Sequence, residues 1–516
     1  MLTAIVLSLV VLISYQFFFM PTPQTPQQES PPSSPQPDGK AKGDGGDPAK
    51  TPAEVPKPVA VTADTKGEEK EIRIDSDLYT AVLSSRGGVL KSVELKDYRD
   101  QKGNPTVLKA DNALPPYALG LDETFQFSGA LFAVRGSDAK LTAAGQAHSV
   151  TFEYSGGGVS VRRTYTFHYG RYGIDLKDEV TGPPSYWITL GKDFGIHQKD
   201  DSVHFGPVLL KDADRKEFTV KDLKEPKYFK EGLKWIAQED KYFFASLVPK
   251  MKIEEARVWN RDGHALVAVR AAAGSSDYFL YVGPKEHDRL QQAGFGLEHI
   301  IDFGFFSILA IPLFWVLKQF YYTFHNYGIA ITVLTVLVRI PFIPLVNMGQ
   351  KSMKKMQDMQ PKMAEVREKY KNDPQKMQKE LMELYKKYKV NPVSGCLPMI
   401  VQIPVFFALY TILSIAIELR GAPFVGWIQD LSSKDPYYVL PIIMGVTMVI
   451  QQKMTPSTMD PVQQKIMLVM PIVFTFLFIS FPSGLVLYWL INNILGIGQQ
   501  YYINKKIARE SAAALS

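Results

Sequence analysis

Arg339 is the residue whose type and surroundings most clearly demand a chemical explanation, because it lies inside the apolar run VLTVLVRIPF, residues 333–342. A guanidinium is not deprotonated in proteins, and an arginine at the centre of a membrane helix costs about 2.5–3.5 kcal/mol on insertion scales. Arg339 precedes Gln350 by about eleven residues, which puts it about 16 Å inside the cytoplasmic end of a helix. A buried carboxylate is the usual way to neutralise such a cation.

The apolar runs that could surround Arg339 contain no such carboxylate. Residues 397–417, 437–450, 466–481 and 484–503 have neither Asp nor Glu, and Glu418 lies at the outer end of its helix. The spans carry uncharged polar residues instead: Thr335, Gln402, Thr411, Ser414, Thr447, Thr475, Asn492, Asn493 and Gln499. Enough of these on one side would form a wet cavity, where an unpaired cation can receive a transient anion. The candidates are a small anion, a lipid headgroup or the acidic residues of another polypeptide. The alternative is an arginine that reaches lipid phosphates or backbone carbonyls.

The distribution of apolar residues predicts a membrane protein with a polar middle. The 516-residue chain is 46% hydrophobic, and its long apolar runs lie in the first 20 and the last 200 residues. The formal net charge of +6 says little about partners. Cys396 is the only cysteine, which excludes an intrachain disulfide.

The N-terminal segments predict an anchor and a tether. Residues 1–20 are apolar, with no basic region before them and no small-residue cleavage site after them, so we expect an uncleaved transmembrane anchor. A cleaved signal peptide is the alternative. Residues 21–61 are rich in proline, glutamine, serine and glycine. Such a segment cannot bury enough apolar surface to fold, so it predicts a disordered tether.

Residues 62–298 predict an all-β sandwich domain. Short runs such as EIRID (71–75), YTAVLSS (79–85) and GVLKSVELKDY (88–98) alternate in polarity or are β-branched, and turn residues separate them. His197 and His204 lie close together in GIHQKDDSVHF. A metal or catalytic pair is one interpretation, but solvated loop residues are favoured on so loose a motif. We therefore expect neither a metal site nor catalytic residues here.

The charge bias sets the expected topology of residues 326–506. Five spans are predicted at about 326–346, 397–417, 437–453, 465–481 and 484–503. The segment 350–389 between the first two carries twelve Lys or Arg against six acids, and the positive-inside rule places it in the cytoplasm. Both termini then lie in the cytoplasm and the β-domain outside. Residues 299–325 become an amphipathic helix on the outer surface, and residues 507–516 a short tail. The uncharged runs 437–450 and 466–481 are short for a normal bilayer, so thinned lipid beside them is one expectation and imprecise ends the other.

The cytoplasmic segment 350–389 predicts a helical hairpin, because Asn372-Asp373-Pro374 interrupts it. Met348, Met353, Met356, Met359 and Met363 recur mostly at three- and four-residue spacings, which predicts a stripe on one helix. Flexible methionines suit a surface that accepts varied hydrophobic partners. Packing of the two helices against each other explains the same pattern, so both interpretations stay open.

Several long motifs resemble one family. They are VLVRIPFIPL, QKSMKKMQDMQPKM, KVNPVSGCLPMIVQIPVFFALY, ELRGAPF, DPYYVLPIIMGVTM and FPSGLVLYWLINN. They closely resemble the YidC membrane-protein insertase family, over about residues 302–506. The order of anchor, tether, outer β-domain and five-span core resembles its Gram-negative form with a large periplasmic domain.

The resemblance implies a multi-pass protein of the bacterial inner membrane that inserts and folds membrane proteins, alone or with the Sec translocon. It implies a hydrophilic groove in which Arg339, Thr335 and the Tyr488–Trp489 pair contact the substrate, and we add Gln402 and Asn492 from the polar residues above. The hairpin methionines Met353, Met356, Met359 and Met363 become the cytoplasmic capture element. Nascent membrane proteins, the lipid bilayer and, transiently, the ribosome are the expected partners, whereas DNA, cofactors and enzymatic activity are not expected.

Two other classes of protein remain alternatives. A small-anion channel or carrier would also use an unpaired arginine in a cavity, but internal repeats or discontinuous glycine-rich helices are expected there. A tethered sugar-processing enzyme would need convergent acids or histidines in residues 62–298, and none stands out.

Overall fold

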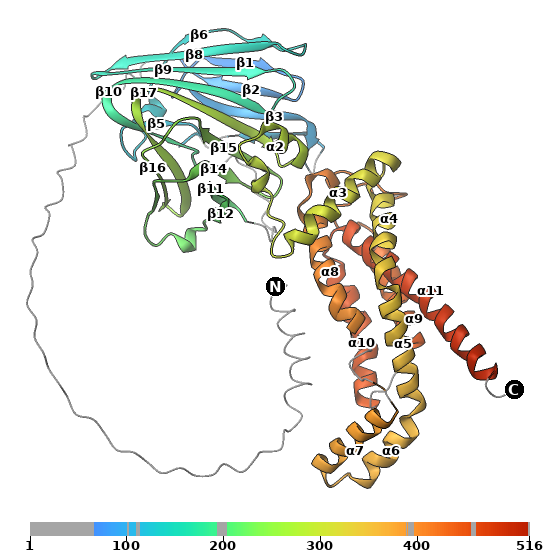
Figure 1. The fold of residues 1–516 in the computed structure, drawn as a ribbon. Helices are drawn as coiled ribbons and strands as arrows, with labels where there is room; N and C mark the ends of the chain where they lie inside the picture. The colour runs from blue at the N-terminus through green and yellow to red at the C-terminus, as the bar shows by residue number, and fades with distance from the viewer. Residues whose placement is uncertain are drawn as a thin grey trace, which may run out of the picture. The chain divides into compact units, whose positions relative to one another are not determined.

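The computed structural model describes residues 67–100, 103–109, 114–192, 204–388, 390, 397–455 and 461–513 (Figure 1). The predicted anchor, the predicted tether and His197 lie outside these residues. The described residues form two compact units. One contains residues 348–388 and 390, and the larger one contains the others.

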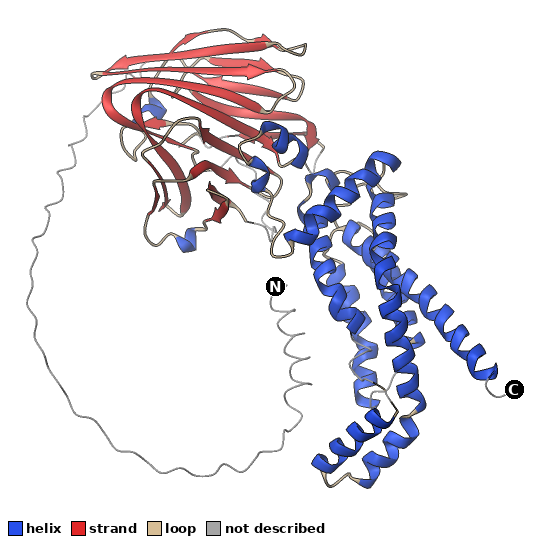
Figure 2. Ribbon diagram, in the orientation of Figure 1, coloured by secondary structure: helices blue, strands red, loops and turns tan. Residues whose placement is uncertain are grey.

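Strands make up the first part of the larger unit (Figure 2). A five-stranded sheet has the order β4-β3-β2-β1-β7, and a twelve-stranded sheet contains the path β12-β11-β14-β15-β17-β10-β9-β8-β6. The strands of the first sheet are β1 (Glu71–Asp75), β2 (Tyr79–Ser84), β3 (Val89–Arg99), β4 (Pro105–Lys109) and β7 (Ala139–Lys140). Those of the second are β5 (Leu119–Gly120), β6 (Ala133–Arg135), β8 (Ala147–Gly156), β9 (Val159–His168), β10 (Gly173–Thr189), β11 (Gly206–Lys211), β12 (Asp214–Glu217), β13 (Lys227–Phe229), β14 (Leu233–Glu239), β15 (Phe243–Pro249), β16 (Glu255–Arg261) and β17 (His264–Pro284).

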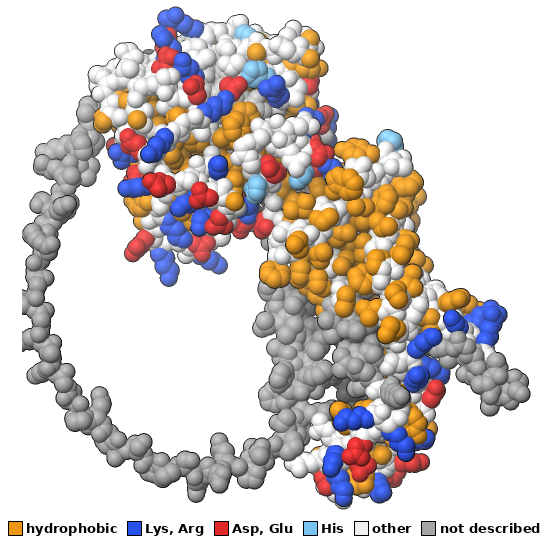
Figure 3. Space-filling model, viewed as in Figure 1, with side chains coloured by type: hydrophobic (Ala, Val, Ile, Leu, Met, Phe, Trp, Pro, Cys, Tyr) orange, Lys and Arg blue, Asp and Glu red, His pale blue; other side chains and the backbone are white. Residues whose placement is uncertain are grey.

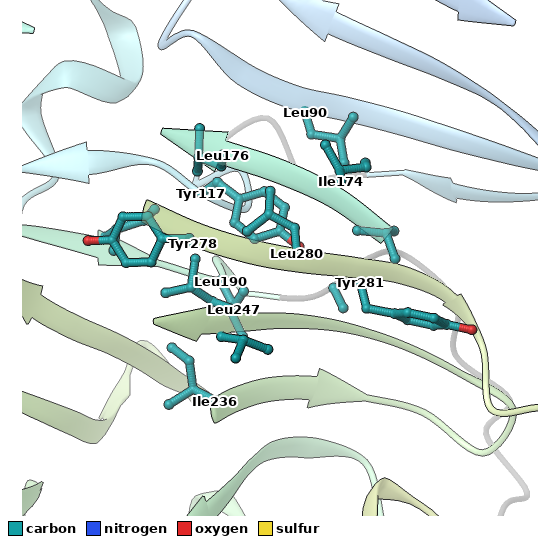
Figure 4. Packing of buried hydrophobic residues seen from close by; sticks show 14 of the residues in the cluster. Leu90, Tyr117, Ile174, Leu176, Leu190, Ile236, Leu247, Tyr278, Leu280 and Tyr281 are labelled. Atoms are coloured by element: carbon teal, nitrogen blue, oxygen red, sulfur yellow. The ribbon is translucent and has the colours of Figure 1, made fainter. Parts of the chain in front are cut away.

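The two sheets share one hydrophobic core. Leu83 and Leu90 of the first sheet and Phe152, Ile174 and Leu176 of the second belong to the same buried cluster. Figure 4 shows part of this packing. Burial alternates along strands such as β1 and β9, whereas β2, β11 and β15 are buried on nearly every residue. The period-two pattern and the β-branched runs both predicted strands here. The prediction of a β-rich domain is confirmed, and the strands expected at 71–75, 79–85 and 88–98 are β1, β2 and β3.

An ion pair lies entirely inside this core. Arg163 on β9 and Asp178 on β10 have fully buried side chains. The guanidinium donates from Nε to Asp178 Oδ1 and from Nη2 to Asp178 Oδ2, both at 2.8 Å. Nη1 donates to the backbone oxygens of Gly88 and Tyr117. Although burial disfavours the charged form, the adjacent carboxylate raises the pKa of Arg163.

Helices make up the rest of the chain. In chain order they are α2 (His287–Ala293), α3 (Ser307–Phe324), α4 (Tyr327–Arg339), α5 (Ile343–Asp358), α6 (Gln360–Lys369), α7 (Pro374–Lys387), α8 (Leu397–Ile415), α9 (Val439–Met454), α10 (Pro461–Phe478) and α11 (Ser483–Ala513). Short 3-10 turns are η1 (Gln126–Gly129), η2 (Val220–Asp222), η3 (Leu297–Ile300), η4 (Ile340–Phe342) and η6 (Ile417–Leu419).

The helices of the larger unit bury a second core. Leu334 of α4, Leu409 of α8, Met444 of α9 and Leu485 of α11 belong to it. Outside this core, α9 and α10 expose large apolar side chains, and Figure 3 shows hydrophobic side chains gathered over part of the visible surface of the helices of the larger unit. A contiguous apolar surface of this kind is stable against hydrocarbon and unstable against water.

The helix ends differ from the predicted spans. α4 begins where expected, because the Asn326 side chain caps it by accepting from the Ile329 N–H at 3.0 Å. α9 begins at Val439 rather than 437, after Tyr438 in a left-handed conformation, and α11 continues into the predicted tail. Tyr327–Asp358 is the helical stretch, within the described residues, that is long and apolar enough to cross a membrane. The apolar helices Val401–Ile415, Val439–Met454 and Leu468–Phe478 are shorter. The number of spans therefore stays a prediction.

The smaller unit is the predicted hairpin. Asp373 caps α7 by accepting from the Lys376 N–H at 3.0 Å, with Pro374 in the first turn, so the predicted interruption is confirmed. The prediction that these methionines form a stripe on one helix is wrong. α5 ends at Asp358 and α6 begins at Gln360, because Pro361 cannot continue the hydrogen-bond ladder.

Candidate functional site

Arg339 lies where the α-helical hydrogen-bond ladder of its span is interrupted. It is the last residue of α4, and η4 separates it from α5. Pro341 has no N–H to give to the Leu337 carbonyl, and the Ile340 N–H donates to that carbonyl instead. The sequence IPF therefore makes a tight turn directly after the arginine. Its side chain is half-buried, and it reaches toward α11.

The guanidinium of Arg339 is held by neutral acceptors. Nη1 donates to the backbone oxygen of Asn492 at 3.0 Å and to its side-chain Oδ1, and Nη2 donates to Gln499 Oε1 at 3.4 Å. Among the described residues no Asp or Glu forms an ion pair with Arg339. Within the described residues, the ligands of the guanidinium are therefore neutral oxygens.

A glycine gives the guanidinium room on α11. A Cβ at Gly496 would lie 3.1 Å from Arg339 Nη2 and 2.7 Å from Gln451 Nε2 of α9. Asn492, Gly496 and Gln499 are spaced by four and three residues, so they share one face of the helix. That face combines two amide acceptors with a gap between them.

Gln499 is itself oriented by α5. Its Nε2 donates to Asn347 Oδ1 at 2.7 Å and to the backbone oxygen of Ile343 at 3.3 Å. With the amide nitrogen committed to α5, the amide oxygen faces Arg339. Gln499 thus links the two sides of the interrupted helix through one side chain.

Tyr488 and Gln402 lie close to this arrangement. The Tyr488 side chain lies near the Gln402 side chain and near Arg339. Tyr488 is buried and Gln402 is half-buried. The structure therefore brings together Arg339, Asn492, Tyr488 and Gln402 as residues of α4, α8 and α11.

Trp489 and Thr335 lie in different environments. The Trp489 ring packs edge-on against Phe406 at a centroid distance of 5.0 Å and against Phe478 at 5.1 Å. Thr335 is only 2% exposed, and its hydroxyl donates to the Ile331 oxygen one turn earlier at 2.7 Å. In this conformation the Thr335 hydroxyl is satisfied within its own helix, and the Trp489 ring is held among aromatic side chains.

The hairpin methionines divide into two sets. Met356, Met359 and Met363 are buried together with Val390 in a small cluster. Met353 is half-buried. The methionines could bind hydrophobic partners or pack the hairpin together. The three buried residues fit the second interpretation.

His204 is a buried structural residue, which corrects its interpretation as a solvated loop residue. Its side chain is 6% exposed and lies 3.8 Å from Glu217. Its Nε2 is 3.2 Å from the Pro207 oxygen. The described residues contain no group of three His, Cys, Asp or Glu that could hold a metal.

Sequence reasoning missed Gly496 and Asn347 and named Gln499 only among many polar residues. The spacing of Asn492, Gly496 and Gln499 was a usable signal, because it places them on one helical face. Asn347 had no such signal, because its contact with Gln499 joins two helices 152 residues apart in the sequence.

Comparisons with known proteins identify the family. Residues 319–510 match the family "60Kd inner membrane protein", and residues 71–316 match the family "YidC periplasmic domain". A protein of Syntrophus aciditrophicus named membrane protein insertase YidC is 43% identical, over 98% of this chain and 99% of that protein. A protein of the same name from Geobacter metallireducens is 44% identical, over 99% of each.

The solved structures include one described as an active YidC insertase with the first transmembrane domain resolved. It is 20% identical, covers 86% of this chain and 95% of its own, and has a TM-score of 0.40. The identities above, over nearly the whole length, place the chain in a family of inner-membrane proteins with a periplasmic domain. The chain belongs to the YidC family of membrane protein insertases.

Proposed function

We propose that this protein inserts integral membrane proteins and helps them fold, through a hydrophilic groove that contains Arg339. The observation that carries the proposal is the cation itself, which is held by amide oxygens of α11 rather than by a carboxylate. A charge kept in a helical core without a permanent partner is suited to a partner that arrives and leaves.

The client's acidic residues supply that partner. A hydrophilic segment bound for the periplasm first enters the groove, where Tyr488, Gln402 and Asn492 hydrate it and Arg339 attracts its carboxylates. This shortens the path that polar groups travel through hydrocarbon, where each unsatisfied group costs several kcal/mol. Trp489 and Thr335 are also proposed to contact the client, Thr335 after rotation of its side chain.

Burial of the client's apolar helix supplies the driving force. The client leaves sideways into lipid, past the exposed apolar faces of α9 and α10. The membrane potential adds to this force for acidic segments that move to the positive side, by about 2.3 kcal/mol per charge per 100 mV. Local thinning of the bilayer beside the short helices assists the same step.

The surrounding organisation follows the same proposal. Five spans and an N-terminal anchor place both termini in the cytoplasm, with the β-domain in the periplasm. The hairpin captures clients on the cytoplasmic side, with Met353 on its surface and Met356, Met359 and Met363 holding its two arms together. The Sec translocon and, transiently, the ribosome are the proposed partners.

Insertion into vesicles tests the proposal. Vesicles carrying the protein receive a single-span client with an acidic tail, and insertion is measured for wild type, Arg339→Lys, Arg339→Ala and Arg339→Glu after equal incorporation is verified. We expect wild type and Arg339→Lys to insert the client, and insertion to fall about tenfold or more in the Ala and Glu variants. Equal insertion by all four proteins would refute the role of Arg339 while leaving the insertase assignment intact.

A small-anion carrier is the competing function. The same vesicles loaded with a radioactive anion distinguish the two, because a carrier moves the anion and inserts no client.

A further inference from the structure

Arg339 donates its hydrogen bonds to neutral oxygen atoms, which another acceptor could replace. The contacts come from the backbone and side-chain oxygens of Asn492 and from Gln499 Oε1, and the Gln499 contact is long, at 3.4 Å. The guanidinium now donates to neutral oxygens, whereas a carboxylate would add the attraction of opposite charges and could accept two parallel N–H bonds. An incoming carboxylate can therefore displace an amide oxygen, whereas an amide cannot displace a carboxylate.

We propose that Gln499 and Asn492 are placeholder ligands, which keep Arg339 over Gly496 until a client carboxylate replaces their amide oxygens. The inference rests on the proposed function and adds to it the residues that set the charge selectivity of the site. Gln499 acts through Arg339, so it is a positioning residue.

The surroundings of Gln499 suit this role. The bonds from its Nε2 to Asn347 Oδ1 and to the Ile343 oxygen fix which end of the amide faces the guanidinium. When Oε1 is displaced, the Nε2 bonds to α5 can remain, so the side chain keeps its place and can return. The neighbouring Gly496 lets Nη2 lie close to the backbone of α11, where a Cβ would crowd both the guanidinium and the Gln451 side chain.

The same positions explain why amides are needed rather than acids. A glutamate at position 499 would have the same shape, but it would pair with Arg339 permanently. The bidentate pair of Arg163 and Asp178 in the β-domain shows what such a permanent partner looks like in this chain. An internal carboxylate would thus occupy the site that the client is proposed to use.

The test compares two clients in vesicles of one composition. Each client has a single span, and the tails differ only by replacement of Asp and Glu with Asn and Gln. The proteins are wild type, Gln499→Glu, Asn492→Asp and Gln499→Met. Gln429→Glu is the charge control, because Gln429 is exposed and lies on a different segment, between η6 and α9.

We expect wild type and Gln429→Glu to prefer the acid-tailed client. In Gln499→Glu and Asn492→Asp that preference falls about tenfold, because insertion of the acid-tailed client falls much more than insertion of the neutral client. Gln499→Met keeps most of the preference, because it removes a neutral ligand and adds no competing charge. If one of the two acidic variants does not incorporate into vesicles, the other is sufficient for the test.

Two results would overturn the inference. If both acidic variants keep the wild-type preference, a built-in carboxylate does not compete with the client. If they lose both clients equally, the amides only support the fold. Failure of wild type to insert either client is a different result, because it overturns the proposed function itself.

Discussion

Arg163 and Arg339 are both enclosed by the fold, but their ligands differ, and the difference separates a structural cation from a functional one. Arg163 donates two 2.8 Å hydrogen bonds to one carboxylate and has no exposed surface. Arg339 is half-buried and donates to amide and backbone oxygens. A buried charge with a permanent partner stabilises one conformation, whereas a charge with replaceable neutral ligands can bind something else.

The largest expected effect comes from removing the permanent partner. Asp178→Asn leaves the Arg163 guanidinium buried without a counter-ion, which should cost about 3–5 kcal/mol in the free energy of unfolding of the β-domain. Hydrogen exchange of peptides from β9 and β10, on the full-length protein in nanodiscs, measures this loss of stability. Glu179→Gln is the matched control, because the neighbouring side chain is 36% exposed and surface pairs contribute at most about 1 kcal/mol. Equal losses in the two variants would remove the distinction drawn for Arg163.

The sequence identified Arg339 as an unusual cation, but nothing in it indicated that Arg163 would be buried. An arginine inside the apolar run VLTVLVRIPF is conspicuous, because hydrocarbon offers nothing to hydrate it. In contrast, VSVRRTYTF contains two adjacent arginines, of which Arg162 is exposed and Arg163 is buried. Alternation within a strand predicts that they face opposite sides, but the burial of the second depends on Asp178 arriving from another strand.

The same contrast explains what was predicted of the fold and of the site. The strands β1 to β3 and the break at Asp373 follow from local patterns, so they were predicted with nearly correct ends. The ligands of Arg339 lie more than 150 residues away on α11, and a helical periodicity does not say which helix its face will meet. Burial of Met356, Met359 and Met363 was likewise decided by tertiary packing, which the methionine spacing left open.

A half-buried carboxylate, that of Asp240, extends the comparison to an anion. Asp240, between β14 and β15, accepts the N–H groups of Tyr242 at 2.8 Å and Phe243 at 2.7 Å. Burial nevertheless raises the pKa of its carboxyl group to about 6. Asp240 thus accepts hydrogen bonds from neutral N–H groups, as Arg339 donates to neutral oxygens, although the cations Lys285 and Arg420 also act on it.

This raised pKa predicts that the free energy of unfolding depends on pH. Between about pH 4 and pH 6 the folded protein retains a proton that the unfolded chain has lost, so stability falls as the pH rises through this range. Asp240→Asn removes that proton equilibrium. The variant should therefore gain about 1–3 kcal/mol relative to wild type between pH 4 and pH 7. Hydrogen exchange of β14 and β15 at several pH values measures the difference, and Asp262→Asn, whose side chain is 82% exposed, should give a difference near zero. A gain that is the same at every pH would contradict the prediction.

The smallest expected change in stability is the one at Arg339. Replacement by methionine removes a half-buried charge that has no ion-pair partner among the described residues, and it leaves behind only the neutral acceptors Asn492 and Gln499. The lost hydrogen bonds and the relieved cost of the charge oppose each other, so the free energy of unfolding of the helical core should change by less than about 1 kcal/mol. Arg163→Met is the matched variant, because it strands Asp178 and should cost several kcal/mol, on the order of the loss in Asp178→Asn. Hydrogen exchange of α4 and α11 peptides, compared with insertion of the acid-tailed client by the same preparation, separates stability from function. Loss of client insertion without loss of protection would establish Arg339 as a binding residue. A loss of stability as large as that of Arg163→Met would make both arginines structural and would end the comparison.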